Sequence, residues 1–289
     1  MRWSKGDRDN IDDERASSGG GMGGMGGGVQ LGLGGVVLLM VLSWATGTDF
    51  LSLLGNGGGP ATSQSGQQSG ELQTSPDEER LVDMVDAVAG DTQATWKQIL
   101  GDRYEMTKVV LFRDATESGC GAAESATGPF YCPSDHKVYL DLAFFKDLSL
   151  RFGAPGDFAQ AYVVAHEFGH HIQNLLGTSD RVRAGSMGAN SGSVALELQA
   201  DCYAGVWGHA AAQGGHLSAG RVELDSGDAE QALRAASMIG DDRLQKMATG
   251  RVQPERFTHG TSAQRMDWFQ RGFKTGDPRQ CDTFASATQ

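Results

Sequence analysis

The stretch AYVVAHEFGHHIQNLLG, residues 161–177, places three histidines and one glutamate inside a largely apolar segment. On a helical wheel, its alanine, valine, phenylalanine, isoleucine and leucine side chains form one broad stripe, which predicts an amphipathic helix over about 157–176. His166 and His170 lie four positions apart, so they share a neighbouring face of this helix, one turn apart. In that arrangement two imidazole rings can bind one tetrahedral Zn²⁺ ion.

Glu167 is rotated away from the line of the two histidines. Its carboxylate would therefore reach a water molecule on the metal more easily than the metal itself. This is the logic of the motif H-E-x-x-H, two ligands with a general base beside them. The alternative is a surface helix with a solvated His/Glu face. His171 lies about 100° round the helix from His170, and we expect it to pack or to support a ligand.

A catalytic zinc site needs a third protein ligand and leaves the fourth position for water. The stretch SVALELQADCYAGVWGH, residues 193–209, places Glu197 and Asp201 on one face of a predicted helix that has almost no other charge. We expect Glu197 to be the third ligand and Asp201 to accept a hydrogen bond from a ligand histidine, which would fix the tautomer of that ring. Two alternatives stay open: the reverse assignment, and an acidic pair exposed to solvent.

Length and charge restrict the class of protein. The chain has 289 residues, enough for one catalytic domain with appendages. Its 24 Lys and Arg against 36 Asp and Glu give a net charge of −12. Because nucleic-acid binding needs a basic surface for the phosphates, this balance argues against a nucleic-acid partner.

The first 75 residues are interpreted as appendages. Residues 1–28 are charged and then glycine-rich, which predicts a disordered cytoplasmic tail. Residues 29–54 contain the densest apolar run and predict a transmembrane signal anchor; a buried core helix and a cleaved signal peptide are the alternatives. Residues 55–75 predict a flexible linker, and 76–289 the catalytic domain.

The basic residues set the expected orientation of the anchor. Four Lys and Arg residues precede the span, and none follows it until Arg80. The positive-inside rule then predicts a single-pass protein of the inner membrane, with a cytoplasmic N-terminus and a periplasmic domain. The four basic residues are Arg2, Lys5, Arg8 and Arg15.

The catalytic domain is predicted to begin with a helix that reaches about Leu100. Ser75 is a plausible N-cap, Pro76 suits the first helical position, and Glu78 would complete a capping box. Gly90 is expected to break this helix.

Two strands and several helices are predicted further along. The strands, at 107–113 and 137–145, are rich in β-branched and aromatic residues. A few strands followed by mostly helices predict an α+β domain, mainly helical with a small sheet, and not a parallel βαβ array. The later helices are expected at about 157–176, 193–213, 228–249 and 262–274.

The state expected for the four cysteines depends on the compartment of the protein. In a cytosolic enzyme they would be free thiols, whereas outside the cytoplasm an even number suggests two disulfides. Of three possible connectivities, we consider Cys120–Cys132 with Cys202–Cys281. The first pair would close a small loop, and the second would tie the C-terminal tail to the helix of Glu197.

The block RFTHGTSAQRMDWFQRGF, residues 256–273, contains a further candidate. Thr261 or Ser262 is a plausible N-cap, and His259 lies just before this helix. His259 could donate a hydrogen bond to the oxyanion of a tetrahedral intermediate, or it could merely pack at the start of the helix. Arg265 could orient a carboxylate or cap a network.

Longer blocks of sequence resemble a known family. HEFGHH followed by ELQAD resembles the zincin metallopeptidases of the glutamate-ligand type. Over all 289 residues the chain is similar to the bacterial family described as "putative neutral zinc metallopeptidase", the YpfJ-like proteins. The blocks that carry the likeness are MRWSKGDRDNIDDER, GCGAAESATGPFYCPSDHKVYLDLAFF, VVAHEFGHHIQ, LELQADCYAGVW and FTHGTSAQR.

The resemblance implies a zincin-like fold and zinc-dependent hydrolysis of a peptide or protein substrate. The residues themselves predict Glu167 as general base and a membrane attachment through residues 29–54. The resemblance also implies an edge strand near the active-site helix that pairs with extended substrate. Residues 137–142 are the candidate for that strand, and a central core strand is the alternative. A different class of function also fits: an anchored, non-catalytic binding or scaffold protein in which zinc only joins two helices.

Overall fold

A computed structural model describes residues 1–16, 72–183, 185–214 and 221–286. The predicted membrane span, 29–54, lies outside these residues, as does most of the predicted linker. Among the helices of the described part, none combines the length and the apolar character that crossing a bilayer requires.

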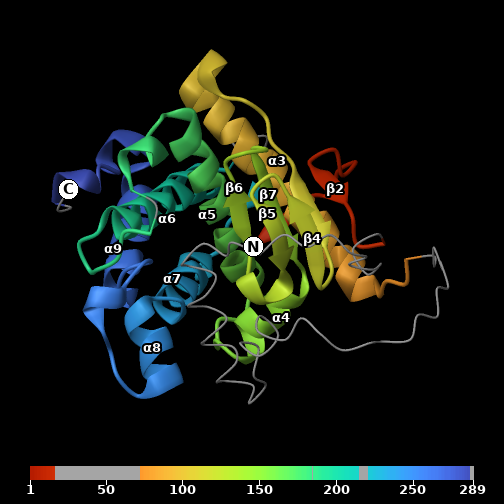
Figure 1. Cartoon of the computed structure of the whole chain (residues 1–289). Helices are drawn as coiled ribbons and strands as arrows, with labels where there is room; N and C mark the ends of the chain where they lie inside the picture. Colours follow the sequence, from red (N-terminus) through yellow and green to blue (C-terminus); the bar gives the residue numbers. More distant parts are fainter. Residues whose placement is uncertain (17–71, 184, 215–220, 287–289) are drawn as a thin grey trace, which may run out of the picture.

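The described residues form a mixed α+β structure (Figure 1). The strands and α3 lie on one side of the molecule, α6 to α9 on the other, and α5 between them. The helices are α3 (Pro76–Leu100), α4 (Ala143–Leu150), α5 (Asp157–Leu175), α6 (Gly192–Ala212), α7 (Asp228–Met238), α8 (Asp241–Thr249) and α9 (Ser262–Thr275). The strands are β1 (Arg2–Trp3), β2 (Ile11–Asp13), β3 (Val109–Phe112), β4 (Ala115–Ser118), β5 (Gly121–Glu124), β6 (Phe130–Cys132), β7 (Lys137–Asp141) and β8 (Val222–Glu223).

The main sheet has four strands in the order β2-β3-β7-β6. The β2–β3 and β3–β7 pairs are parallel, which the expectation of an α+β domain did not anticipate, and β6 runs antiparallel to β7. Because β7 is paired on both sides, the choice of 137–142 as a substrate-pairing edge strand is wrong, and the core-strand alternative is right. The edge next to β7 is β6.

The main apolar core lies where α5 meets the sheet and the surrounding helices. Fully buried side chains come from α3, β3, β7, α5 and α6, among them Val85, Leu111, Leu140, Phe158 and Trp207. Burial of this apolar surface stabilises the fold at about 25 cal/mol per Å². The helix that carries H-E-x-x-H is thus held in the centre of the protein.

The residues predicted to begin and end the helices are mostly confirmed. Ser75 caps α3 by accepting a hydrogen bond from the amide of Glu78, but the side chain of Glu78 pairs with Arg15 and Arg113 instead of closing a capping box. The predicted helix at 228–249 is divided into α7 and α8, because Gly240 packs directly against Ser262 and the chain turns there.

The predicted break at Gly90 is wrong, since α3 runs through it unbroken. Glu79, Asp83, Asp86 and Gly90 follow one another on a single stripe of α3. A side chain at Gly90 would lie 2.6 Å from the guanidinium of Arg221, so this glycine makes room for a neighbouring group.

That stripe of α3 binds the N-terminal segment, residues 1–16. Arg8 pairs with Glu79 and Asp83, and Asn10 donates hydrogen bonds to Asp86. The backbone of the same segment forms β1, which pairs with β8, and β2, which pairs with β3. The prediction of a disordered tail is therefore wrong for residues 1–16, because composition does not reveal a complementary acidic surface far along the chain.

The connectivity Cys120–Cys132 with Cys202–Cys281 is confirmed. The S–S distances are 2.08 Å and 1.99 Å, respectively. The first disulfide joins the β4–β5 hairpin to β6, and the second joins α6 to the C-terminal segment.

The N-terminal segment can be tested through Arg15, which is 3% exposed and pairs with Asp13, Glu78 and Glu79. We expect Arg15→Ala to lower the free energy of unfolding by about 2–3 kcal/mol, because it removes the guanidinium partner of Asp13 and one of the two arginines that pair with each of Glu78 and Glu79. The matched control is Arg2→Ala. The side chain of Arg2 is 68% exposed, so its removal should lower the stability much less. Denaturant unfolding measures both, and equal small effects would mean that the segment contributes no stability.

Candidate metal centre

Helices α5 and α6 bring His166, His170 and Glu197 together. Nε2 of His166 lies 3.2 Å from one carboxylate oxygen of Glu197, and Nε2 of His170 lies 3.5 Å from the other. One donor atom from each residue falls within 4.8 Å of the others, so among the described residues this group could hold a metal ion. Two imidazole nitrogens and a carboxylate are a donor set that fits zinc.

A glycine between the two histidines sets the distance between the helices. A Cβ at Gly169 would lie 2.9 Å from the backbone of Ala200, so α5 and α6 touch without an intervening side chain. Ala200 is three residues beyond Glu197 on α6. The close contact therefore places the glutamate within reach of both histidines.

Asp201 contacts His166 at the ring nitrogen away from Glu197. Its carboxylate lies 2.8 Å from Nδ1 of His166, and it also accepts the hydroxyl of Tyr162. Arg265, on α9, donates to both oxygens of Asp201 at 2.8 and 2.9 Å. Since a carboxylate accepts, Nδ1 of His166 carries a hydrogen, and Nε2 is the nitrogen that faces Glu197 and would bind a metal ion.

The charges of this centre shift one another's pKa. Burial alone would lower the pKa of His166, but Asp201 and Glu197 outweigh it and raise the value to about 10. Burial would raise the pKa of Glu197, yet His170, His259 and His166 hold it well below its usual range. Both carboxylates are thus ionised at neutral pH, because Arg265 and His166 likewise lower the pKa of Asp201 against its burial.

Glu167 lies beside the first histidine and lines the cleft, although it is only 7% exposed. Burial raises its pKa above the ordinary value for a glutamate, and the neighbouring histidines oppose the change. A carboxylate with a raised pKa next to a metal centre suits a group that must both accept and release a proton.

His259 reaches the cleft from the loop before α9. Oδ2 of Asp241 accepts the backbone amides of Thr258, His259 and Gly260, and Oδ1 lies 3.3 Å from Nδ1 of His259. Partial burial would lower the pKa of His259, but Glu197 and Asp241 raise it. Thr261 is the N-cap and forms a capping box with Gln264, so the predicted start of this helix is confirmed.

The cleft around these groups has a volume of about 670 Å³. Its walls come from the β4–β5 hairpin, β6, α4, α5, α6 and the α7–α9 region. Among the described residues of its lining, the charged side chains are Glu167, Glu197 and Arg265, beside three histidines, and the others are apolar or uncharged and polar. Apolar contributions include Phe130, Phe144, Phe152, Val163, Ile239 and Leu244.

His171 supports the edge strand and not the metal. Its Nε2 donates to the backbone carbonyl of Glu105 at 2.7 Å, so its Nδ1 accepts the hydroxyl of Tyr131 at 3.1 Å. Asn174 also donates to that hydroxyl. His171 and Asn174 therefore fix β6 on α5, beside the metal centre.

Sequence reasoning missed several supporting residues. Tyr162 and Gln173 lie on α5, one turn before His166 and one turn after His170, so the helical period could have identified them. The roles of Arg265 and Asp241 depend on contacts between distant segments, and no local pattern signals them. Arg265 orients a carboxylate, which is one of the two roles considered for it.

Fold and site together place an H-E-x-x-H helix beside a glutamate from a second helix, the donor set of a zinc site. The chain belongs to the family described as "Putative neutral zinc metallopeptidase", whose model matches residues 1–284. The resemblance noted from the sequence blocks is thereby confirmed.

Relatives cover most or all of the chain. "Uncharacterized protein YpfJ" of Escherichia coli K12 is 46% identical over 299 aligned positions, which cover 99% of this chain and all of the relative. "Uncharacterized protein Mb2605" of Mycobacterium bovis and "Uncharacterized protein Rv2575" of Mycobacterium tuberculosis are 46% identical over 222 positions, 75% of each chain. No solved structure matches this chain.

The ligand assignment can be tested by zinc binding. We expect Glu197→Ala to lose zinc, whereas Asp201→Asn should weaken the affinity by about 10- to 100-fold, because it changes the partner of His166 but removes no ligand. Glu223→Ala, a change of the same type at a partly exposed site on β8, is the control. Chelator competition measures the affinities, and equal affinities in all these variants would contradict the assignment.

Proposed function

We propose that this chain is a zinc-dependent peptidase in which His166, His170 and Glu197 hold the ion. The observation that carries the proposal is the convergence of two Nε2 atoms and one carboxylate. The Nδ1 atom of each histidine is occupied on the far side of its ring, by Asp201 or Gln173. When bound, zinc would supply polarisation of the scissile carbonyl and a lowered pKa for the attacking water.

Glu167 is the proposed general base. Its carboxylate accepts a proton from the attacking water and then delivers it to the nitrogen of the leaving amine. A site that only joins two helices has no use for a buried carboxylate directly beside its first ligand. The position of Glu167 in the lining of the cleft therefore favours the peptidase over a non-catalytic scaffold protein in which zinc only joins two helices.

His259 is the proposed stabiliser of the developing negative charge. With Nδ1 held by Asp241, its Nε2 is available to donate to the oxygen of the scissile carbonyl. The raised pKa of His259 favours the protonated ring, which has a hydrogen on that nitrogen.

The substrate is proposed to be an extended peptide that adds to the edge of β6. This strand lines the cleft, and within the described part of the chain no other strand pairs with its side away from β7. The lack of charged side chains outside the metal centre in the described lining favours uncharged residues around the scissile bond.

Location is a separate proposal. Two disulfides favour an oxidising compartment outside the cytoplasm. The long apolar stretch at 29–54, whose one charged residue is Asp49, supports an attachment to the membrane. Residues 1–16 pair with strands of the domain, so we propose that this segment and the metal centre share one side of the membrane, in place of the opposite sides predicted from the basic residues.

The catalytic role can be tested with Glu167→Gln. We expect this variant to keep zinc and thermal stability but to hydrolyse peptides at least about 100-fold more slowly, because the amide cannot accept the proton. The matched control is Glu105→Gln, whose side chain is 70% exposed. A broad peptide library read by mass spectrometry gives the rates. The peptidase proposal fails if neither wild type nor variant cleaves, or if both cleave equally.

The location can be tested by labelling introduced cysteines in spheroplasts. Lys5 is 65% exposed and Asp102 is fully exposed, so Lys5→Cys reports on the N-terminal segment and Asp102→Cys on the domain. We expect a membrane-impermeant maleimide to label both variants. Labelling of Asp102→Cys alone would place the two segments on opposite sides and contradict the proposal.

A further inference from the structure

The second metal-binding histidine has a buried partner on the side away from Glu197. Nδ1 of His170 lies 2.9 Å from Oε1 of Gln173, one turn further along α5, and Gln173 is 0% exposed. An amide oxygen can only accept, so Nδ1 carries the hydrogen. Nε2 is then the ring nitrogen that faces Glu197 and is left for a metal ion.

The orientation of the Gln173 amide is fixed in turn. Its Nε2 donates to the backbone carbonyl of Leu196 at 2.7 Å and to Oε1 of Gln199 at 3.1 Å. If the amide turned over, its oxygen would face two other oxygens, the carbonyl of Leu196 and Oε1 of Gln199. The two acceptors on α6 therefore select the orientation that supports the ligand.

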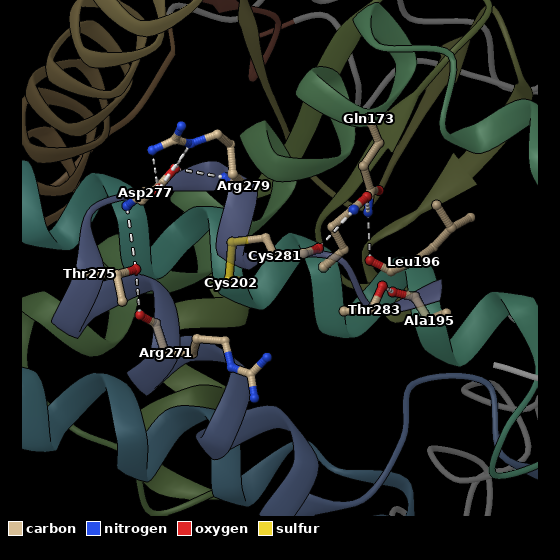
Figure 2. Close-up of a disulfide and its surroundings, with 11 residues drawn as sticks. Gln173, Ala195, Leu196, Cys202, Arg271, Thr275, Asp277, Arg279, Cys281 and Thr283 are labelled. Atoms are coloured by element: carbon tan, nitrogen blue, oxygen red, sulfur yellow. Dashed lines mark hydrogen bonds and ion pairs between the residues drawn. A yellow bond between two sulfur atoms is a disulfide. The ribbon is translucent and has the colours of Figure 1, made fainter. Parts of the chain in front are cut away.

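Gln199 extends this chain of hydrogen bonds to the C-terminal segment. Its Nε2 donates to the backbone carbonyl of Cys281 at 2.9 Å, which directs its Oε1 toward Gln173. Cys281 is bonded to Cys202 on α6, and the hydroxyl of Thr283 donates to the carbonyl of Ala195 (Figure 2). The disulfide and Thr283 thus hold the carbonyl of Cys281 in place, behind the metal centre.

We propose that Gln173, Gln199 and the disulfide-held carbonyl of Cys281 are positioning residues for His170. The C-terminal segment, 281–283, then serves the metal centre although it lies outside the cleft. The inference rests on the proposed zinc site and adds to it a device that fixes the tautomer and the direction of one ligand.

The two disulfides differ in this respect, and the difference supplies a control. Cys202–Cys281 is linked to His170 through Gln199 and Gln173. Cys120–Cys132 lies at the rim of the cleft, and in the described part of the chain no hydrogen bond links it to a metal-binding residue. Loss of the two bonds should therefore affect zinc binding differently.

The first test replaces the glutamines in the full chain. We expect Gln173→Met to weaken zinc binding by about 10- to 100-fold, the usual effect of removing the partner of a ligand histidine, and Gln199→Met to weaken it less. Gln160→Met is the matched control, because Gln160 lies on the same helix and the described residues offer no partner to its side-chain oxygen. Chelator competition gives the affinities, and melting of the zinc-free proteins separates loss of stability from loss of affinity.

The second test removes each disulfide. We expect Cys202→Ala with Cys281→Ala to weaken zinc binding and to change the absorption spectrum of the cobalt-substituted protein, and Cys120→Ala with Cys132→Ala to leave both unchanged. The inference is overturned if wild type binds zinc while the glutamine and Cys202–Cys281 variants match their controls; the zinc site would then stand without it. If wild type itself binds no zinc, the proposed function fails together with the inference.

Discussion

The burial of one carboxylate, that of Asp201, is the constraint on which the centre of this protein depends. Its side chain is 0% exposed, and an isolated ionised carboxylate in such a place would cost several kcal/mol. Hydrogen bonds from three neighbours offset this cost in free energy: Tyr162 and His166 from α5, and Arg265 from α9. Because the partners come from different helices, α5, α6 and α9 must keep their relative positions for the charge to stay satisfied.

Close backbone contacts make these positions possible. A Cβ at Gly205 on α6 would lie 2.2 Å from the carbonyl oxygen of Phe269, and one at Gly272 on α9 would lie 1.9 Å from the carbonyl oxygen of Cys202. Gly169 does the same between α5 and α6. The helices therefore pack at the shortest distance that their backbones allow, and the short reach of a glutamate or aspartate side chain is enough to join them.

Sequence alone could predict the groups of residues that are close neighbours within one helix or at its first turn. His166, Glu167 and His170 are related by the period of one helix, and so are Glu197 and Asp201. The caps at Ser75 and Thr261 follow from hydrogen bonds between residues three apart.

What sequence reasoning missed depends on contacts between distant segments. The edge position of β6 follows from the order of the strands, which no single strand reveals. The N-terminal segment shows the same limit, since its cations find acidic partners that lie about 70 residues further along the chain. Taken alone, a short charged and glycine-flanked segment has too little apolar surface to order itself; the stripe on α3 supplies the charge complement and the strands supply the backbone partners.

The buried polar groups behind the metal centre have a further implication. Apolar side chains of similar size in place of a buried ion pair are often neutral or stabilising, by about 1–4 kcal/mol. The group formed by Asp201, Arg265, Gln173 and Gln199 is therefore poorly explained by stability alone. Asp201 and Gln173 do what apolar residues cannot: each accepts the hydrogen on Nδ1 of one histidine, and Arg265 and Gln199 hold these two acceptors in place. The back of the site is hydrogen-bonded and fixed, whereas Glu167 and His259 face the open cleft. This division is what a centre needs if its ligands must stay still while protons move on the other side.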